Sequence, residues 1–588
     1  MKKWFWGLMT GMALMSLLLV LASIVGWYLQ QRPPQVSPNT FLVLEISGEL
    51  PEQNPPDLAG QLLGGDGPMT FVPLLQNIEK AGADSRIAGL LLKPSGVRAG
   101  WAKLEQLRSA LEQFRRRGKK IIAVLSQGGT REYFLASAAD QVALSPVGVL
   151  DLKGMRAEVM FFKDSLGKLG IQADLEHIGR YKNLSDQFTE NQMSDAFREA
   201  TTSMLDSIYG HFLETVAAAR HTSAEEIQGR FEQNGPFEAE RALEAGLVDV
   251  LSYEDQVWEQ LEKEAQGMKP KKMAMREYRR VPRSEVGLRG DERIALVYAV
   301  GNITQGEDEF DPVFGGKTMG SETMASVLKT VADDESIKGV VVRIDSGGGD
   351  AFASDEIWRS MMLLRQKKPL VISMSDLAAS GGYYMAATGD PIVAERGTLT
   401  GSIGIVYGKL NLKGFYDKVG VRKEVIRRGP FAAMDSDYGP YNPEERQRVR
   451  ALMQDFYQKF LAKVAEARKM SPEAVDRIAQ GRVWTGEQAR ENGLVDEIGG
   501  LDTALEILKK KAGIPPDARV NLVEYPRRKS LFELLLSRAR GDEGNGSTAL
   551  SVWVGAVSPW TRVSPWKWME QYFPSPVWAR MPYTFDFR

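Results

Sequence analysis

Short apolar runs alternate with amphipathic segments through most of the chain. In the first half, apolar runs occupy residues 41–50, 89–96 and 119–126, and helical periodicity covers residues 74–81 and the charged stretch that follows 96. Runs rich in β-branched residues that alternate with helices indicate βαβ units and a buried, largely parallel sheet. We therefore expect the α/β fold class.

The same series of elements recurs in the second half of the chain. Apolar runs occupy residues 294–303, 338–349 and 368–375, separated by helical patterns at 326–332 and 355–366. Internal similarity of this kind marks duplicated structural units. Nine residues of the first half reappear with the same identity and a constant spacing of 250, namely Asp84/Asp334, Ile87/Ile337, Gly89/Gly339, Tyr133/Tyr383, Ala136/Ala386, Asp140/Asp390, Gly154/Gly404, Gly170/Gly420 and Gly179/Gly429.

The repeats divide the chain into five parts. We predict two tandem α/β domains at residues 39–265 and 293–526, with mainly parallel sheets. Residues 266–292 are polar and basic without an apolar period, which favours a linker. Residues 527–588 form an extension that holds five of the twelve tryptophans and many prolines, and we favour packing of this extension on the domain surface over contact with a membrane.

The amino terminus, residues 1–38, predicts a cytoplasmic stub, a transmembrane anchor and a proline-rich stalk. From Trp4 to Tyr28 the chain carries no charge. A helix of that length reaches about 37 Å and crosses a bilayer core of about 30 Å. Lys2 and Lys3 place its start in the cytoplasm. A cleaved signal peptide is the alternative, although only Val20-Leu21-Ala22 resembles a cleavage site.

Composition narrows the classes of function. The chain has 588 residues, which is too long for one core, and its 74 basic and 76 acidic residues give no sign of a nucleic-acid partner. A hydrophobic fraction of 43 % fits a globular protein and not a polytopic membrane protein. The absence of cysteine excludes disulfides, thiolate catalysis and cysteine-based metal sites. We expect no cofactor and no metal.

Three stretches of the second repeat are candidates for chemistry. Residues 344–350, IDSGGGD, follow an apolar strand and could turn a backbone N–H toward a bound oxygen. Ser380 lies among small residues at a strand-to-helix junction that would expose its hydroxyl, where helix-terminal N–H groups could stabilise an oxyanion. The third stretch is Gly401-Ser402-Ile403-Gly404. Taken singly, each also fits a plain turn or a small-residue packing face.

The two repeats differ at the positions that matter for catalysis. Ser380 corresponds to Thr130, whereas Lys182 of the first repeat corresponds to Ala432. The chain has only three histidines, none in a recognisable catalytic context, so a carboxylate, an amine or a chain terminus must serve as the base. A lysine can do so if burial lowers its pKa from about 10.4. One site assembled from two domains is the interpretation that accounts for both differences, because each repeat would supply the residue that the other lacks. Taken alone, Lys182 also fits a surface lysine.

Together, the sequences SDLAASGGYYMA around Ser380, RIDSGGGD, GSIG and GRYKN resemble the signal peptide peptidase A family, the long membrane-anchored serine proteases of the ClpP/crotonase fold. The resemblance extends from the amino-terminal anchor to about Lys511. It implies that Ser380 is the nucleophile and Lys182 its general base. Gly348 or Gly349 with the N–H of Gly381 would form the oxyanion hole, and Ser402 would orient the lysine. Gly347 stands where the family has proline.

The resemblance also implies partners and a location. It predicts a homotetramer in the bacterial inner membrane, anchored by one helix, with its catalytic domains on the periplasmic side. Cleaved signal peptides and other unfolded apolar peptides would be the substrates. Two other classes stay open, an acyl-CoA enzyme that uses the same fold and a catalytically silent membrane scaffold.

Overall fold

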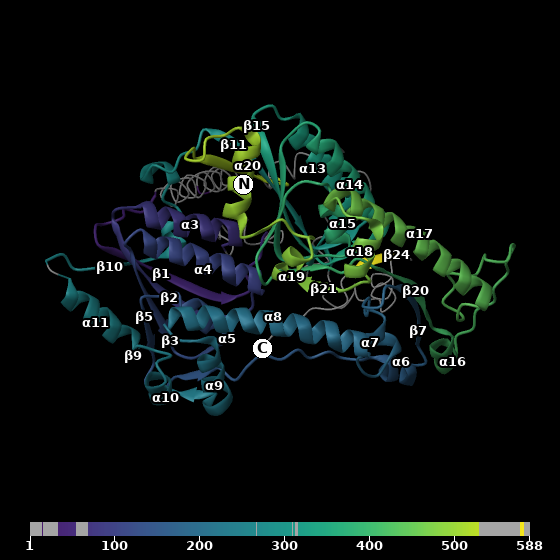
Figure 1. The fold of residues 1–588 in the computed structure, drawn as a ribbon, viewed down its shortest axis with the longest axis horizontal. Helices are drawn as coiled ribbons and strands as arrows, with labels where there is room; N and C mark the ends of the chain where they lie inside the picture. The colour runs from purple at the N-terminus through teal and green to yellow at the C-terminus, as the bar shows by residue number, and fades with distance from the viewer. Residues whose placement is uncertain are drawn as a thin grey trace, which may run out of the picture.

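The computed structural model describes residue 15 and residues 33–53, 69–265, 267–308, 310–311, 316–527 and 577–580. Two α/β units lie side by side, the first drawn in purple to teal and the second in teal to yellow (Figure 1). Apart from Met15, the predicted anchor at residues 4–28 lies outside the described residues. Within the described part of the chain, no helix combines the length and apolarity that crossing a bilayer requires.

The first unit is built on a parallel sheet of order β10-β1-β2-β3-β5-β9. Strand β10 is the last strand of this sheet along the chain. It lies in the segment expected to be a linker, where it pairs with β1. The elements of this unit are β1 Thr40–Gly48, α3 Phe71–Ala83, β2 Ile87–Val97, α4 Trp101–Arg116, β3 Lys120–Leu125, β4 Gly128–Gly129, α5 Thr130–Ala136, β5 Gln141–Leu144, β6 Val149–Asp151, α6 Lys163–Leu169, β7 Gln172–Ile178, α7 Asp186–Thr189, α8 Asp195–Ala219, α9 Ala224–Asn234, β8 Phe237–Glu238, α10 Ala239–Glu244, β9 Val250–Leu251, α11 Glu254–Glu264, β10 Lys271–Ala274, α12 Met275–Tyr278 and the 3₁₀ helix Arg283–Val286.

The second unit has an eight-stranded sheet in which six strands repeat this order as β23-β11-β15-β17-β18-β22, all paired in parallel. The other two strands are β19, which pairs with β17, and β21, which runs antiparallel to β19. Two α/β units with mainly parallel sheets therefore confirm the coarse fold prediction. The elements are β11 Glu292–Val300, β12 Asn302–Thr304, β13 Phe310–Asp311, β14 Gly316–Gly320, α13 Ser321–Asp333, β15 Ile337–Ser346, β16 Gly348–Asp350, α14 Ala351–Arg365, β17 Leu370–Ala379, α15 Gly381–Ala386, β18 Ile392–Ala394, β19 Leu399–Gly401, β20 Ile405–Asn411, α16 Lys413–Val419, α17 Pro443–Arg468, α18 Pro472–Ile478, β21 Val483–Thr485, α19 Gly486–Glu491, β22 Glu497–Ile498, α20 Leu501–Ala512, β23 Val520–Tyr525 and β24 Val577–Arg580.

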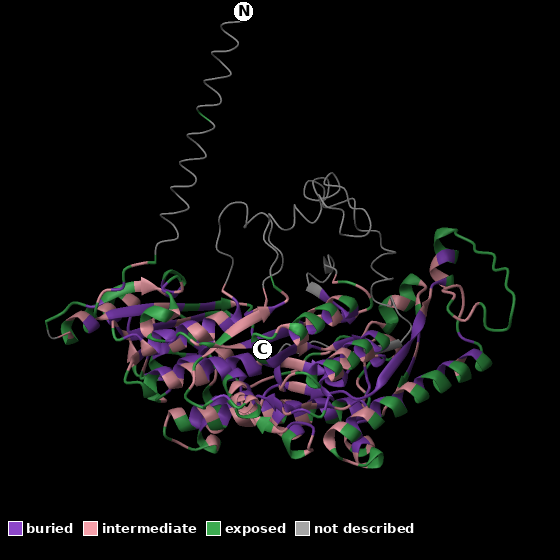
Figure 2. Ribbon diagram, turned by 90° about the horizontal axis from the view of Figure 1, so that it is seen from above, coloured by how far each residue is buried: buried purple, intermediate pink, exposed green. Residues whose placement is uncertain are grey.

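Strand β15 illustrates why continuous apolar runs form the centre of each sheet. Val340 and Val342 pack into the core beneath α13 and α14, whereas Val341 between them packs into a separate core with α20. A strand covered by helices on both faces needs apolar residues at every position, because its side chains alternate between the two faces. The burial colouring shows the result, with buried strands inside each unit and exposed residues at the edges (Figure 2).

One strand of the first repeat belongs to a sheet of the second. Strand β7 pairs with β20 over seven residues in antiparallel register, from Gln172 opposite Asn411 to Ile178 opposite Ile405. The full sheet has the order β13-β14-β12-β16-β24-β20-β7. The two strands lie side by side at the right of Figure 1. This ladder joins the repeats through backbone hydrogen bonds, so it sets the position of the residues that follow β7.

Buried ion pairs hold the repeats together near the middle of the molecule. The guanidinium of Arg343 in β15 donates to the carboxylate of Glu52 from the first repeat at 2.9 Å, and both side chains are fully buried. Lys103 in α4 lies 2.6 Å from Asp345 and 3.2 Å from Asp376, both in the second repeat. Asp376 also accepts hydrogen bonds from two N–H groups at the start of α4. A helix of one repeat is thus capped by a carboxylate of the other.

Replacing Arg343 tests this interface. Arg343→Leu leaves the Glu52 carboxylate buried without its cation, so the free energy of unfolding should fall by about 3–5 kcal/mol in urea titrations. Adding Glu52→Leu should recover part of that loss, because no uncompensated charge remains. Lys413→Met, which breaks the exposed pair with Asp417, is the control. A loss with Arg343→Leu no greater than with the control would contradict the interpretation.

Candidate active site

Strand pairing gathers the chemistry of the second repeat at one sheet edge. Ser346 near the end of β15 pairs with Ala378 near the end of β17. The glycine loop, residues 347–349, starts directly after Ser346, and the candidate nucleophile Ser380 follows Ala378 by two residues. Since carboxyl ends of neighbouring parallel strands meet at the same edge, the loop and the serine must lie close together.

Ser380 adopts a backbone conformation that residues other than glycine seldom occupy, with φ of 56° and ψ of −116°. Its N–H donates to the carbonyl of Gly401 at 2.8 Å, and its own carbonyl accepts from Tyr384 as α15 begins. These bonds hold a sharp turn between β17 and α15. Backbone strain of this kind is commonly found at functional sites. The turn directs the hydroxyl away from the strand and toward the first repeat.

The Lys182 side chain of the first repeat reaches that hydroxyl. Its Nζ lies 2.7 Å from Ser380 Oγ and donates to both the carbonyl and the hydroxyl of Ser402 at 2.9 Å. All three residues are fully buried. Burial lowers the pKa of Lys182 well below its ordinary value of 10.5, and no carboxylate among the described residues offsets that effect. Burial therefore favours the neutral form of the amine, which is the form that can accept a proton.

The loop that carries Lys182 packs backbone to backbone on a loop of the second repeat. The Tyr181 N–H donates to the carbonyl of Gln480 at 2.7 Å. At Gly481, with φ of +76°, a Cβ would lie only 2.5 Å from the Cβ of Lys182. Only glycine permits this approach. Ser402 is held from the same side, because its N–H donates to the carbonyl of Arg482 at 2.7 Å.

The three glycines expected to form an oxyanion hole lie on neighbouring elements. Gly348 and Gly349 begin β16, and Gly381 is the first residue of α15, where helix N–H groups have no partner within the helix. The two elements touch closely, since a Cβ on Gly382 would lie 2.5 Å from the carbonyl oxygen of Ser346. The N–H of Gly348 donates to Ser346 Oγ at 3.1 Å.

Asp350, whose charge lies close to this loop in the sequence, has a separate structural task. One carboxylate oxygen accepts from the N–H of Ala353 at 2.8 Å and caps α14, and the other accepts from Gln305 at 3.1 Å. The carboxylate is thus bound to donors of its own.

In the first repeat, a glutamate side chain occupies the place that corresponds to the start of α15. Glu132 stands where the second repeat has Gly382, and its carboxylate accepts from the N–H of Val97 at 2.7 Å and of Gly129 at 2.9 Å. Val97 corresponds to Gly347 of the glycine loop. Gly129 corresponds to Ala379, and the carboxylate bound here places a negative charge next to Thr130, which opposes a developing oxyanion.

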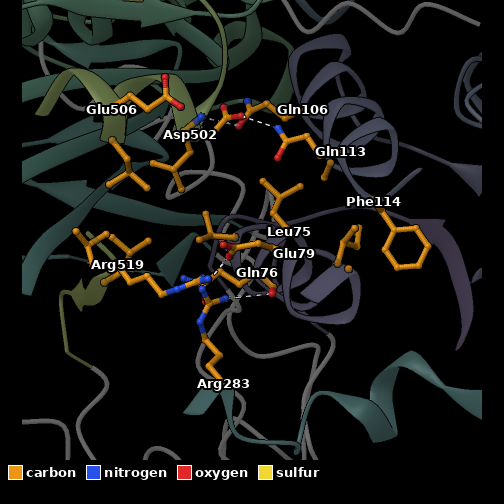
Figure 3. Close-up of a pocket in the computed structure, with 18 of the residues that line it drawn as sticks. Leu75, Gln76, Glu79, Gln106, Gln113, Phe114, Arg283, Asp502, Glu506 and Arg519 are labelled. Atoms are coloured by element: carbon orange, nitrogen blue, oxygen red, sulfur yellow. Dashed lines mark hydrogen bonds and ion pairs between the residues drawn. The ribbon is translucent and has the colours of Figure 1, made fainter. Parts of the chain in front are cut away.

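A cavity of about 420 Å³ lies elsewhere, between α3 and α4 of the first repeat and α20 of the second. Figure 3 shows its polar rim, where Gln113 donates to Asp502 at 3.0 Å and Arg283 pairs with Glu79 at 2.8 Å. Its lining residues include no hydroxyl, imidazole or dyad residue. The cavity therefore offers no hydroxyl nucleophile and no histidine base.

Sequence reasoning missed the charged residues behind the glycine loop. Asp345 lies in β15 directly before its last residue, Ser346, and burial raises the pKa of Asp345 to about 6 although Lys103 opposes the shift. Lys103 thereby ties the base of the loop to the first repeat. Asp345 lies within the motif RIDSGGGD, but nothing in the sequence indicates that it pairs with a lysine 242 residues away.

A buried serine at a strained helix start, an amine on its hydroxyl and glycine backbone at the next strand end form the arrangement of a serine hydrolase. Peptidase family S49 matches residues 113–268 and 362–515, one segment in each repeat. The chain belongs to peptidase family S49 and is a serine protease, which confirms the prediction made from the motifs.

Relatives of known name cover most of the chain. It is 34 % identical to "Serine protease SPPA, chloroplastic" of Arabidopsis thaliana, over 88 % of this chain and 75 % of that protein. It is 32 % identical to "Protease 4" of Salmonella typhi, over 79 % of this chain and 77 % of that protein. "Protease 4" of Haemophilus influenzae is 28 % identical over 82 % of this chain and 80 % of that protein.

The lowered pKa of Lys182 predicts a pH-dependent cost to stability. Between the folded pKa and the unfolded value of about 10.4, the unfolded chain binds one more proton, so wild-type stability rises with pH there. Lys182→Met removes this dependence. It should unfold at higher urea than wild type at pH 7, with a gain that shrinks as the pH approaches 10.4.

Urea midpoints at pH 7 and pH 9.5 measure this effect. Lys367→Met is the matched control, because that lysine is 58 % exposed and pairs with Asp333 at the surface. A gain that is the same at both pH values would mean that Lys182 is not held neutral in the folded protein.

Proposed function

We propose that the protein is a membrane-bound endopeptidase with a Ser380/Lys182 dyad that degrades cleaved signal peptides and other unfolded apolar peptides. The observation that carries the proposal is the 2.7 Å contact between Lys182 Nζ and Ser380 Oγ in a fully buried setting. An amine kept neutral by burial is the base that a serine needs where histidine is absent from the site.

The mechanism follows from the positions of these groups. Neutral Lys182 accepts the proton of Ser380 as Oγ attacks a peptide carbonyl, and the oxyanion is held by the N–H of Gly381 together with that of Gly348 or Gly349. Ser402 keeps the resulting ammonium oriented through the two acceptors that it offers. The ammonium then protonates the leaving amine, and water, deprotonated by Lys182, hydrolyses the acyl-enzyme.

The membrane anchor at residues 4–28, a bacterial inner-membrane location and periplasmic catalytic domains form part of the same proposal. The uncharged run behind Lys2 and Lys3 supports them. Two relatives are bacterial proteases. A protease on the outer side of that membrane meets signal peptides as they are released, which fits a substrate class of apolar, unfolded segments.

We also infer that each repeat has the ClpP/crotonase fold and that the protein assembles into a homotetramer. The shared six-strand order of the two sheets supports the fold. Support for assembly comes from the inter-repeat ladder. Residues 155–161 correspond to β20 and residues 422–428 to β7, yet neither segment lies in a strand within the chain.

The second of these segments is exposed throughout, with Ile426 at 88 %, and belongs to the loop drawn in green beyond α16 (Figure 2). If it pairs with residues 155–161 of a second copy in the register of β7 and β20, Ile426 faces the partner subunit's Ala157. Such a head-to-tail contact generates a ring where the rotation between successive copies closes. Each copy would then repeat between subunits the ladder it already forms within itself.

Three substitutions test the dyad with a leucine-rich signal peptide as substrate. Ser380→Ala and Lys182→Ala should each lower kcat/KM by at least about 10³-fold, because the two residues act as one unit. Thr130→Ala, at the equivalent position of the first repeat, should retain wild-type cleavage. A serine-directed acylating agent should label wild type at Ser380. Retained activity in Lys182→Ala would refute the dyad, and a silent, unlabelled wild type would favour the scaffold.

The assembly is tested by placing a charge in the proposed ladder. Ile426→Asp should reduce the mass measured by light scattering in detergent from that of a tetramer to that of a smaller species, because the aspartate would be buried against the neighbouring subunit. Leu363→Asp, on an exposed position of α14, is the control and should leave the mass unchanged. An unaltered mass for Ile426→Asp would exclude this interface.

A further inference from the structure

Arg482 contacts both of the segments that set the position of the Lys182 amine. It ends the loop on which Lys182 packs, directly before β21. The carbonyl of Arg482 accepts the N–H of Ser402 at 2.7 Å. Its guanidinium carbon lies 5.0 Å from the centre of the ring of Tyr181, the residue directly before Lys182. A single residue of the second repeat thus reaches the base-bearing loop with its side chain and the lysine-orienting serine with its backbone.

The guanidinium of Arg482 is fixed by a second ring and by a carboxylate. Its central carbon lies 4.3 Å from the centre of the Trp484 ring. One nitrogen pairs with Glu199 of the first repeat at 2.7 Å, and the same carboxylate accepts the hydroxyl of Tyr181 at 3.0 Å. Only 16 % of the Arg482 side chain is exposed. A planar cation that stacks on rings while it pairs with a carboxylate is a task that arginine performs and lysine does not.

Glu199 connects this cluster to a long helix of the first repeat. It lies on α8, which lies close to β21 of the second repeat (Figure 1), where the hydroxyls of Ser207 and Thr485 are 2.9 Å apart. The hydrogen bonds from Tyr181 and Arg482 hold the pKa of Glu199 below its ordinary value, so the carboxylate stays charged. The cluster is therefore anchored on α8 as well as on the loop.

The backbone beside the cluster is strained and needs support from outside. Ser402 and Gln480 have φ of 52° and 53°, a region that residues other than glycine seldom occupy. Strained residues of this kind persist only where surrounding contacts over-determine them. The carbonyl of Gln480 accepts the Tyr181 N–H at 2.7 Å, and Arg482 supplies the corresponding contact to Ser402. A displaced Arg482 would therefore release both segments together.

We propose that Arg482 is a positioning residue, which holds the Lys182 amine in its buried place through the contact with Tyr181. This inference rests on the proposed dyad. Its consequence concerns protonation, because burial is the cause of the lowered pKa of Lys182. A looser loop would admit water and raise that pKa toward its ordinary value. Several titratable side chains surround the loop without contributing to the lowered pKa, namely Arg180, Tyr181, Asp186, Glu199, Tyr457, Asp476 and Arg482.

The test is the pH profile of cleavage of a leucine-rich quenched peptide by matched variants. Arg482→Met removes the guanidinium, and Tyr181→Leu removes the ring beside it. Arg180→Met is the control, because Arg180 also lies over the Tyr181 ring, at 5.3 Å, and 3.7 Å from Glu199, but is 65 % exposed. Tyr181→Phe is the conservative variant, which keeps the ring and loses the hydroxyl.

We expect Arg482→Met and Tyr181→Leu to move the acidic limb of kcat/KM upward by about one pH unit and to lower kcat about tenfold on that limb. KM should stay unchanged, because the proton transfer contributes to the transition state and not to binding of the peptide. Activity should recover at higher pH, where the amine is again neutral. The double variant should match the single ones, since the two side chains act as one unit. Arg180→Met and Tyr181→Phe should keep the wild-type profile.

Stability gives a measurement that does not depend on turnover. The gain in urea midpoint on Lys182→Met at pH 7 should be smaller in the Arg482→Met background than in the wild-type background, because the amine there is less desolvated. An equal gain in both backgrounds overturns the proposal. If Arg482→Met fails to fold, the same comparison is made with Tyr181→Leu.

The outcomes separate this inference from the proposed function. A wild-type profile in Arg482→Met and Tyr181→Leu, or a loss that is equal at every pH, overturns the positioning role and leaves the dyad intact. The same shift in Arg180→Met also overturns it, because an exposed cation would then serve as well as Arg482. Cleavage that persists in Ser380→Ala or Lys182→Ala overturns the dyad itself.

Discussion

The structure depends on one requirement, the burial of an uncharged amine against a serine hydroxyl from the other half of the chain. Lys182 has no carboxylate partner in the described structure, so its lowered pKa comes from exclusion of water alone. That exclusion requires the two repeats to fit closely. The β7–β20 ladder aligns them, and Gly481 removes the side chain that would hold them apart.

Duplication gave two copies of one site, and each copy has kept a different part. The second repeat retains the serine and the open glycine loop, while the first retains the lysine. In the first repeat the Glu132 carboxylate accepts from the N–H groups of Val97 and Gly129, beside the position that corresponds to Ser380. The vestigial site has thereby become a structural hydrogen-bond cluster, which explains how it could lose its chemistry without losing its fold.

The sequence predicted those features that repeat or have a period. The constant spacing of 250 between equivalent residues revealed two α/β units, and the contrast of Ser380 with Thr130 and of Lys182 with Ala432 revealed which residues would have to meet. The contact of Lys103 with Asp345 joins positions 242 residues apart and has no periodic signature. The strand at residues 577–580 could not be predicted either, because four residues that pair through their backbone need no particular side-chain pattern.

Under the proposed mechanism, the division of the dyad between repeats also determines when the protein becomes active during its own synthesis. Lys182 emerges from the ribosome 198 residues before Ser380. At about 5–20 residues per second, that interval lasts roughly 10–40 s. Until β20 is made and has paired with β7, the amine has no serine to deprotonate. A nascent chain, which is itself an unfolded peptide with apolar segments, therefore cannot cleave itself before its own site has formed.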